Sequence, residues 1–420
     1  MIKNFRSIDG FFNEKLNLEE INNIKKNKYY LPIGSGSSIS RLSFKKGVNL
    51  IIDKKNYEII FDKRKKLVTV SANTTVGQLH NFLLSKKFYC DFFPSYSLAT
   101  IGSCIASGTH GQIPQKGVFN DFVKEIKIFN PNFGIKTLTK NNNAELFKIT
   151  KSGLGLTGII LQAKIYVKKI KSTKISYNTK VIHNLHDAYK FLKKSNYDFQ
   201  QNVFSYDPNK KKPFLGRIYY GKFCEGNFIY KKLSERKIPK IRLGIFKINI
   251  FKKIIFKILF FLESFKNKFC NEMHINDILF TSNKRFVYFN FLPKKFIEYQ
   301  NIVPDHKVKK YLADFEIIFA KHKPNITLMH LKIFNKKPQG FEFNGKGMSV
   351  AIHIVVDKNF KNFTRSLFWL DAKYGCKINI YKNSLVNKQI LKKFYPKYYK
   401  KYCSDLKKIN KFYKFSNSIF

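Results

Sequence analysis

PSYSLATIGSCIASGTHG, residues 94–111, is the stretch of sequence that most narrows the choice of fold. It is crowded with Gly, Ala and Ser, and it ends in a His-Gly pair. Small side chains let the backbone approach a bulky object closely, and glycine also reaches backbone conformations that other residues avoid. We therefore expect residues 94–111 to lie against a large flat ligand.

Two other stretches of small residues flank this one. PIGSGSS (32–38) stands between two extended segments, and its consecutive N–H groups can bind a pyrophosphate, with the Ser hydroxyls as further donors. SGLGLTGII (152–160) contains G-x-G-x-x-G, which in a Rossmann unit leaves a strand and opens a helix. Here a helical pattern precedes the motif and an alternating, β-branched run follows it. We reject a Rossmann unit and expect these glycines to pack backbone closely or to contact a cofactor.

The pattern between about residues 30 and 170 is rich in strands with short helices. Apolar residues at helical spacing, with a Thr available as a cap, predict a helix over 74–87. β-branched and alternating runs predict the strands. The other expected elements are strands at 48–53, 66–72, 121–130, 135–140 and 159–170 and a helix at 141–150.

A second region, 173–376, alternates strands and helices. Within it, residues 241–269 are both basic and strongly apolar. This segment is either a core helix with a solvated lysine edge or an interfacial segment on anionic lipid, where buried apolar area and lysine attraction act together. Both alternatives stay open.

The charge balance favours anionic partners. Lys and Arg number 79 against 27 Asp and Glu, a formal net charge of +52 in 420 residues. Part of this excess is explained by an AT-rich coding sequence, because Lys, Asn, Ile and Phe are all frequent. Zinc-finger spacing, a helix-turn-helix signature and RRM-type aromatic pairs are absent from the sequence, so we expect no nucleic-acid partner.

The cysteines and the termini bear on the compartment. The six cysteines are widely spaced without a CxxC, which indicates reduced thiols and no metal site. The N-terminal residues are too charged for a signal peptide, and the most apolar run, 254–262, is interrupted by Lys257 and too short to span a bilayer. We expect a cytoplasmic protein, peripheral on the inner face of the membrane if 241–269 binds lipid.

In their order and spacing the three small-residue stretches resemble the FAD-binding (PCMH-type) domain of the vanillyl-alcohol-oxidase family. GVFND (117–121) and ELFKITKSGLGLTGII (145–160) extend the likeness. The resemblance implies an α+β fold of two domains. The FAD-binding domain would comprise residues 1–172 completed by 377–420, with an inserted α+β substrate-binding domain at 173–376.

The second half is similar to the decaprenylphosphoryl-β-D-ribose 2-oxidase group. The segments that carry this likeness are FIEYQNIVP (296–304), MHLKIFNKK (329–337), GMSVAIHIVV (347–356), INIYKNS (378–384) and FYP (394–396). The resemblance implies oxidation at C2 of a polyprenyl-phosphate-linked pentose, the first half of an epimerisation in cell-envelope polysaccharide biosynthesis. A short-chain dehydrogenase/reductase partner would complete it.

The same resemblance assigns site residues. It implies no metal, and it makes Lys382 and His110 catalytic. It places the FAD pyrophosphate on Gly34, Ser35, Gly36, Ser37 and Ser38, the flavin along Gly102, Ser103, Ala106, His110 and Gly111, the adenine end near Ile160, and the substrate on Tyr288, Gln300, Lys332 and Phe334. Ser37 stands where many relatives carry a His that bonds covalently to the flavin, so FAD is expected to be non-covalent.

The expected chemistry is transfer of a hydride from a carbinol carbon to flavin N5 while a base or water takes the hydroxyl proton. Lys382 would stabilise the negative charge of the reduced flavin, or hold the sugar hydroxyl and assist its deprotonation. Lys332 and Gln300 suit hydrogen bonds to sugar oxygens or phosphate.

Three departures from the ribose oxidase leave the substrate open. Ile39 and Asn379 replace tyrosines, and Ala351 replaces a cysteine. One alternative is therefore a soluble aldonolactone or alditol oxidase that uses O2. Another is a catalytically silent flavin-binding partner in a glycan-assembly complex.

Overall fold

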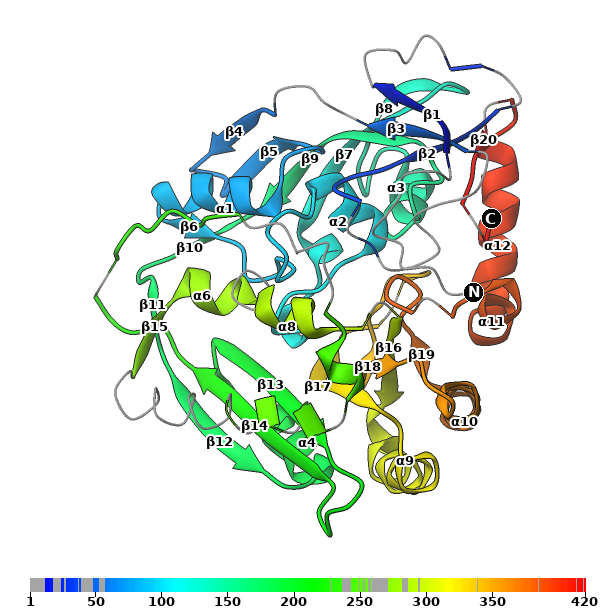
Figure 1. Cartoon of the computed structure of the whole chain (residues 1–420). Coiled ribbons are helices and arrows are strands. Elements are labelled where there is room, and N and C mark those ends of the chain that lie inside the picture. Colours follow the sequence, from blue (N-terminus) through cyan, green and yellow to red (C-terminus); the bar gives the residue numbers. More distant parts are fainter. Residues whose placement is uncertain are drawn as a thin grey trace.

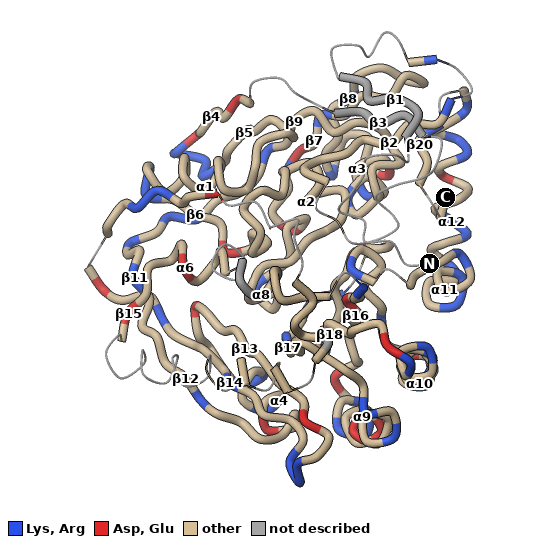
Figure 2. The backbone as a smooth tube through the Cα atoms, in the orientation of Figure 1, with Lys and Arg blue, Asp and Glu red and all other residues tan. Residues whose placement is uncertain are grey.

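The computed structural model shows a mixed helix-and-sheet protein built around two large sheets (Figure 1). It describes residues 12–17, 24–25, 28–36, 38, 48–52, 57–226, 228–235, 243–248, 250–251, 254–255, 258, 271–281, 286–293, 295–337, 339–383, 385–412, 414–417 and 419–420. Lys and Arg are spread along many elements rather than confined to one (Figure 2). Among the described residues, no helix is long and apolar enough to cross a bilayer.

The first large sheet is antiparallel and lies in the N-terminal half. Its strand order is β4 (Ile59–Asp62), β5 (Leu67–Ser71), β9 (Ile159–Tyr166), β7 (Val123–Asn130) and β8 (Gly134–Leu138). The helices α1 (Val76–Ser85) and α2 (Ile101–Ser107) share one apolar core with this sheet. Thr75 and Gln78 form a capping box at the start of α1, as the Thr in the sequence predicted.

The order of elements around the 153–158 glycines confirms the rejection of a Rossmann unit. Helix α3 (Ala144–Thr150) precedes the motif and strand β9 follows it. The motif therefore joins a helix to a strand, the reverse of the connection that presents a helix N-terminus to a pyrophosphate.

The two ends of the chain meet in a smaller parallel sheet. Its order is β1 (Phe12–Asn17), β3 (Val48–Ile52), β2 (Tyr29–Pro32) and β20 (Lys414–Phe415). Helices α11 (Lys388–Phe394) and α12 (Pro396–Ile409) pack beside it, and the Tyr402 hydroxyl donates to the Gly153 carbonyl at 2.5 Å. The C-terminal tail thus covers the glycine-rich loop before β9 (Figure 1).

The second large sheet has seven antiparallel strands. The order is β12 (Asn178–Ile182), β14 (Phe214–Gly221), β13 (Phe199–Tyr206), β17 (Ile326–Asn335), β18 (Lys346–Val355), β16 (Phe296–Pro304) and β19 (Lys377–Ile378). Helices α4 (Leu185–Lys194), α9 (Val308–His322) and α10 (Phe360–Tyr374) cover one face and bury it. Because side chains alternate across a strand, the other face is left for polar residues.

Shorter elements connect the two halves. They are the pairs β6 (Phe88–Tyr89) with β10 (Lys168–Lys169) and β11 (Lys174–Ser176) with β15 (Glu272–His274), the helices α6 (Ile275–Leu279) and α8 (Phe286–Phe291), and 3-10 turns at Pro114–Lys116, Phe119–Phe122, Ile245–Lys247 and Asp305–Lys307. The core of the first sheet takes in Ile175, Phe199 and Tyr219. The apolar core therefore crosses residue 172, and the domain division expected there stays a prediction. Most of 241–269 lies outside the described residues.

Candidate functional site

One cavity of about 740 Å³ runs between the two large sheets. This volume is in the range of cofactor and small-ligand sites. Apart from Phe334, every expected site residue that the structure describes lines the cavity. They are Gly34, Ser35, Gly36, Ser38, Gly102, Ser103, Ala106, His110, Gly111, Ile160, Tyr288, Gln300, Lys332 and Lys382. Ser37 and Ile39 lie outside the described residues.

The three small-residue stretches converge at one end of the cavity. Loop residues Ser152 and Leu154 donate their backbone N–H groups to carbonyls of Ile105 and Ala106 in α2, each at 2.9 Å. A Cβ on Gly34 would lie 2.3 Å from Thr100 Oγ1. The small residues thus permit close packing of the protein's own backbone as well as approach to a ligand.

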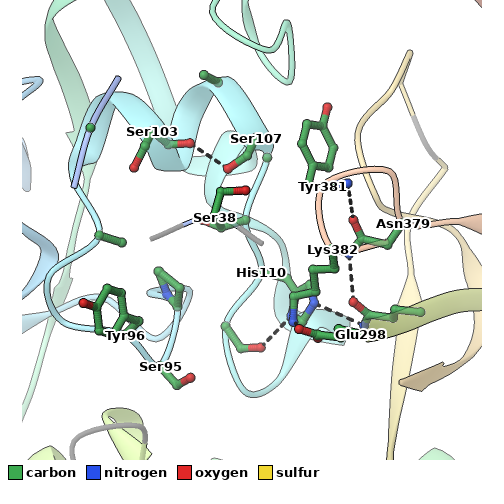
Figure 3. A pocket seen from close by; sticks show the side chains of 18 of the residues that line it. Ser38, Ser95, Tyr96, Ser103, Ser107, His110, Glu298, Asn379, Tyr381 and Lys382 are labelled. Carbon is green, nitrogen blue, oxygen red and sulfur yellow. Dashed lines mark hydrogen bonds and ion pairs between the residues drawn. The ribbon is translucent and has the colours of Figure 1, made fainter. Parts of the chain in front are cut away.

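This end of the cavity fits a pyrophosphate. Gly36 has φ of 64°, the left-handed conformation that lets successive N–H groups point to one side. Hydroxyls of Ser103 and Ser107 lie along α2 at the cavity wall (Figure 3). Among the described lining residues Glu298 is the one carboxylate, and its ion-pair partner is Lys382, far along the chain from these serines. An anion therefore meets no opposing charge from the Gly/Ser stretches.

His110 is fixed and neutral. Its Nδ1 lies 3.0 Å from the Gly111 carbonyl and its Nε2 lies 3.4 Å from the Gln300 amide nitrogen. These partners assign the proton to Nδ1 and leave Nε2 as an acceptor. Burial, together with the charges of Lys332 and Lys382, holds the pKa of His110 well below its usual value. The imidazole therefore presents a hydrogen-bonding shape rather than a charge.

Gln300 is held from three sides. Its amide nitrogen donates to Ser349 Oγ at 3.0 Å as well as facing His110, and its oxygen accepts from Asn379 Nδ2 at 2.8 Å. Asn379, one of the departures noted in the sequence, so takes a positioning role at the cavity wall. Lys332 Nζ donates to the Gly111 carbonyl at 2.9 Å, which ties β17 to the loop after α2.

Phe334 does not reach the cavity, so the expectation of a direct substrate contact is wrong in this structure. Its ring is buried in a small cluster with Val118, Ile302 and Phe343. It packs edge-on against His110, with ring centroids 5.4 Å apart. Phe334 therefore supports the imidazole instead of meeting the substrate.

Lys382 forms an ion pair that the sequence did not predict. Its Nζ lies 3.0 Å from Glu298 Oε1, beside His110 (Figure 3). Burial alone would raise the pKa of Glu298, but Lys382 and His353 outweigh it and hold that pKa well below its usual value. Glu298 is therefore an ionised carboxylate inside the cavity wall.

A polar chain continues from Glu298 across the sheet. Its Oε2 lies 3.7 Å from His353 Nε2, whose Nδ1 is 2.8 Å from the Tyr288 hydroxyl. That hydroxyl is also 2.9 Å from Thr327 Oγ1. Glu298 and His353 are direct cross-strand partners on β16 and β18, so the sheet register itself brings them together.

Glu298 carried a signal in the sequence that pointed to it. It lies two residues before Gln300 in an otherwise apolar strand, and residues at i and i+2 share a face. A carboxylate on the face that carries an expected substrate residue is a candidate for the site. His353 and Thr327 carried no such signal, because their partners are distant in sequence.

The comparisons with known proteins agree with this geometry. Residues 21–138 match the protein family described as FAD binding domain. The relatives include D-arabinono-1,4-lactone oxidase of Candida glabrata, 30% identical over 35% of this chain and 30% of its own length. Mitochondrial L-galactono-1,4-lactone dehydrogenase of Arabidopsis thaliana is 26% identical over 43% and 32%, and L-gulonolactone oxidase of Mus musculus is 26% identical over 41% and 40%.

The matched portions set how far the likeness extends. The chain spans about a third of the length of these curated relatives. The family match confirms the expectation of FAD as cofactor, and the named relatives, all oxidases or dehydrogenases, support the expectation of an FAD-dependent oxidoreductase. Residues 21–138 form an FAD-binding domain, and the chain is a flavoprotein similar over part of its length to sugar-lactone oxidases and dehydrogenases.

Proposed function

We propose that the protein is an FAD-dependent oxidoreductase that oxidises a secondary hydroxyl group of a sugar lactone or related polyol. One observation carries this proposal: a single cavity joins a Gly/Ser-lined end suited to FAD with a polar end that holds Glu298 and Lys382. The names of the relatives, which act on aldono-1,4-lactones, support the lactone as the substrate class.

The residues of the polar end divide the work. When bound, FAD supplies the two-electron acceptor for a hydride from the carbinol carbon. The ionised Glu298 carboxylate receives the hydroxyl proton. Its low pKa does not prevent this, because a hydroxyl whose carbon is losing a hydride becomes strongly acidic. Lys382 orients the carboxylate and donates a hydrogen bond to the substrate oxygen.

The neutral residues fix the geometry. His110 and Gln300 are held by Gly111, Ser349 and Asn379, so they form a rigid wall next to the reacting carbon. Preorganised groups of this kind need no reorientation during the reaction.

The test is anaerobic mixing of the purified flavoprotein with L-galactono-1,4-lactone, D-arabinono-1,4-lactone or a free alditol. Bleaching of the flavin band by a lactone supports the proposal, and oxygen consumption with peroxide formation afterwards identifies O2 as acceptor. A protein with full FAD that no lactone or polyol bleaches contradicts it and favours a silent flavin-binding role. Acid precipitation of the same sample shows whether the FAD is non-covalent.

A second candidate substrate is a polyprenyl-phosphate-linked pentose, oxidised at C2. The segments that resemble the ribose oxidase are β16, β17, β18 and the turn after β19, which together line the polar end of the cavity. Lys332 on β17 adds a cation suited to a phosphate. Flavin bleaching by the lipid-linked pentose and not by lactones would select this candidate, and its keto product would then need a reductase partner.

A further inference from the structure

Residues 243–258, here named the docking segment, pack one side against the cavity wall. Phe246 is fully buried, and its ring lies 5.6 Å from that of Tyr288 on α8. Ile255 packs into the same cluster, which includes Phe296. Tyr288 and Phe296 both line the cavity. The inner side of the docking segment thus lies directly behind the substrate end of the site.

The outer side of the docking segment exposes large apolar residues. Leu243, Ile250, Phe251, Ile254 and Ile258 are 47% to 63% exposed. The described residues from 250 to 258 are helical, and positions 250, 254 and 258 repeat at the spacing of one helix face. Single exposed apolar residues are ordinary, but a stripe of them marks an interaction surface.

The charge around the stripe has one sign. Lys247, Lys252, Lys253 and Lys257 interleave with the apolar residues, and positions 236 to 262 contain no Asp or Glu. An apolar stripe bordered by lysines matches a surface that is apolar beneath and anionic on top.

Other occupants fit this surface less well. A second copy of the chain carries the same net charge of +52, so two such faces would repel each other. Nucleic acid offers the negative charge without an apolar layer for Ile250, Ile254 and Ile258. A bilayer with anionic headgroups offers both.

We propose that the docking segment binds the surface of an anionic lipid bilayer, with the stripe of Ile250, Ile254 and Ile258 entering the interface. Since its inner side supports Tyr288 and Phe296, docking sets the substrate end of the cavity beside the membrane. This proposal does not depend on which hydroxyl the enzyme oxidises.

The experiment is co-sedimentation of the full-length flavoprotein with phosphatidylcholine vesicles, with and without phosphatidylglycerol. The test variant is I250S/I254S/I258S. The matched control is I60S/I135S/I317S, three isoleucines of similar exposure elsewhere on the surface. We expect the wild type and the control to bind the anionic vesicles, the test variant to bind at least tenfold more weakly, and none to bind pure phosphatidylcholine.

Salt separates insertion from diffuse attraction. At about 1 M salt charges are screened within a few ångströms, so binding that persists there comes from the apolar stripe. The proposal is overturned if the test variant binds like the control, or if all binding disappears at high salt. It is also overturned if sedimentation velocity shows a dimer that only the test variant lacks.

A second variant keeps the test valid if the serine variant loses its flavin. K252Q/K253Q/K257Q retains the stripe and removes three charges, so it should bind anionic vesicles several-fold more weakly at low salt and equally at high salt. Unchanged binding of this variant at low salt contradicts the charge part of the proposal.

Discussion

Glu298 and Asp371 are two buried carboxylates whose surroundings act in opposite directions. Glu298 faces Lys382 and His353, so its pKa lies well below the usual value. Asp371 has no cation among the causes of its shift, and burial raises its pKa to about 6 although Tyr299, Asn301 and Tyr311 donate hydrogen bonds to it. The first is therefore ionised at neutral pH and suited to chemistry, while the second is a structural group of the core.

Replacing Glu298 tests its part in catalysis. E298Q removes the charge that orients Lys382 and receives the proton, so we expect kcat/KM to fall about 10- to 100-fold, the worth of a hydrogen bond to a charged group. Flavin content should not change. The control is E125Q, which breaks the 2.9 Å pair with Lys164 away from the cavity. Wild-type turnover in E298Q would exclude the assigned role.

The raised pKa of Asp371 predicts a pH dependence of stability. The fold favours the protonated carboxyl, so this contribution is complete below the usual value of 3.8 and is lost as the pH rises through about 6. The rise from 3.8 to about 6 corresponds to about 3 kcal/mol. Denaturation of D371N should therefore show its stability, relative to wild type, improving by up to that amount from low to neutral pH.

A second variant gives the opposite sign. Asp314 on α9 accepts from Lys373 and Tyr374, which lower its pKa. D314N should lose stability relative to wild type as the pH rises. Parallel pH profiles for the two variants would show that the carboxyl surroundings do not act as described.

At the scale of elements, the loop of Pro32 to Gly36 and the helix α2 form one unit. Gly34 sits so close to Thr100 that a methyl group does not fit between them. The pyrophosphate end of the cavity depends on this approach, since both elements line it.

Substituting Gly34 should therefore weaken FAD binding. In G34A the new Cβ would lie 2.3 Å from Thr100 Oγ1, which forces the loop away from α2. We expect a clear drop in the ratio of flavin to protein absorbance. The double variant G34A/T100A removes the clashing atom and should recover much of the flavin, whereas T100A alone should retain it. Full flavin content in G34A would contradict the packing argument.

Elements of the FAD-binding part were predictable because their signals are local. The Thr cap placed α1, β-branched runs placed β5 and β7, and the reversed helix-to-strand context excluded a Rossmann unit. Site residues were less accessible. Strand alternation gives the face of Phe334 but not its depth along β17, where Val118 and Phe343 cover it. Glu298 depends on Lys382, 84 positions away, and a local pattern carries no information on such a contact.

At the scale of the whole molecule, the cavity is built from distant parts of the chain. Its walls run from Leu31 to Lys382 and include both large sheets. A ligand in this cavity meets its full set of contacts only when both halves are folded, so binding favours the native state.

FAD removal should therefore lower thermal stability. At free FAD about 1,000 times its Kd, one site adds about 4 kcal/mol, which shifts Tm by several degrees in a large chain. Differential scanning fluorimetry of the flavin-depleted protein should show this loss, and added FAD should reverse it. Equal Tm values with and without FAD would place the cofactor outside the cavity.

The two-faced strands of the seven-stranded sheet have a consequence for how the protein can change. On β16, Glu298 and Gln300 face the cavity while Ile297 and Tyr299 enter the core under the helices. Ala351 on β18 follows the same rule. Substitutions at the cavity positions leave the packing beneath intact, so selection or design can alter substrate preference with little loss of folding stability. The sheet thus separates the evolution of specificity from the maintenance of the fold.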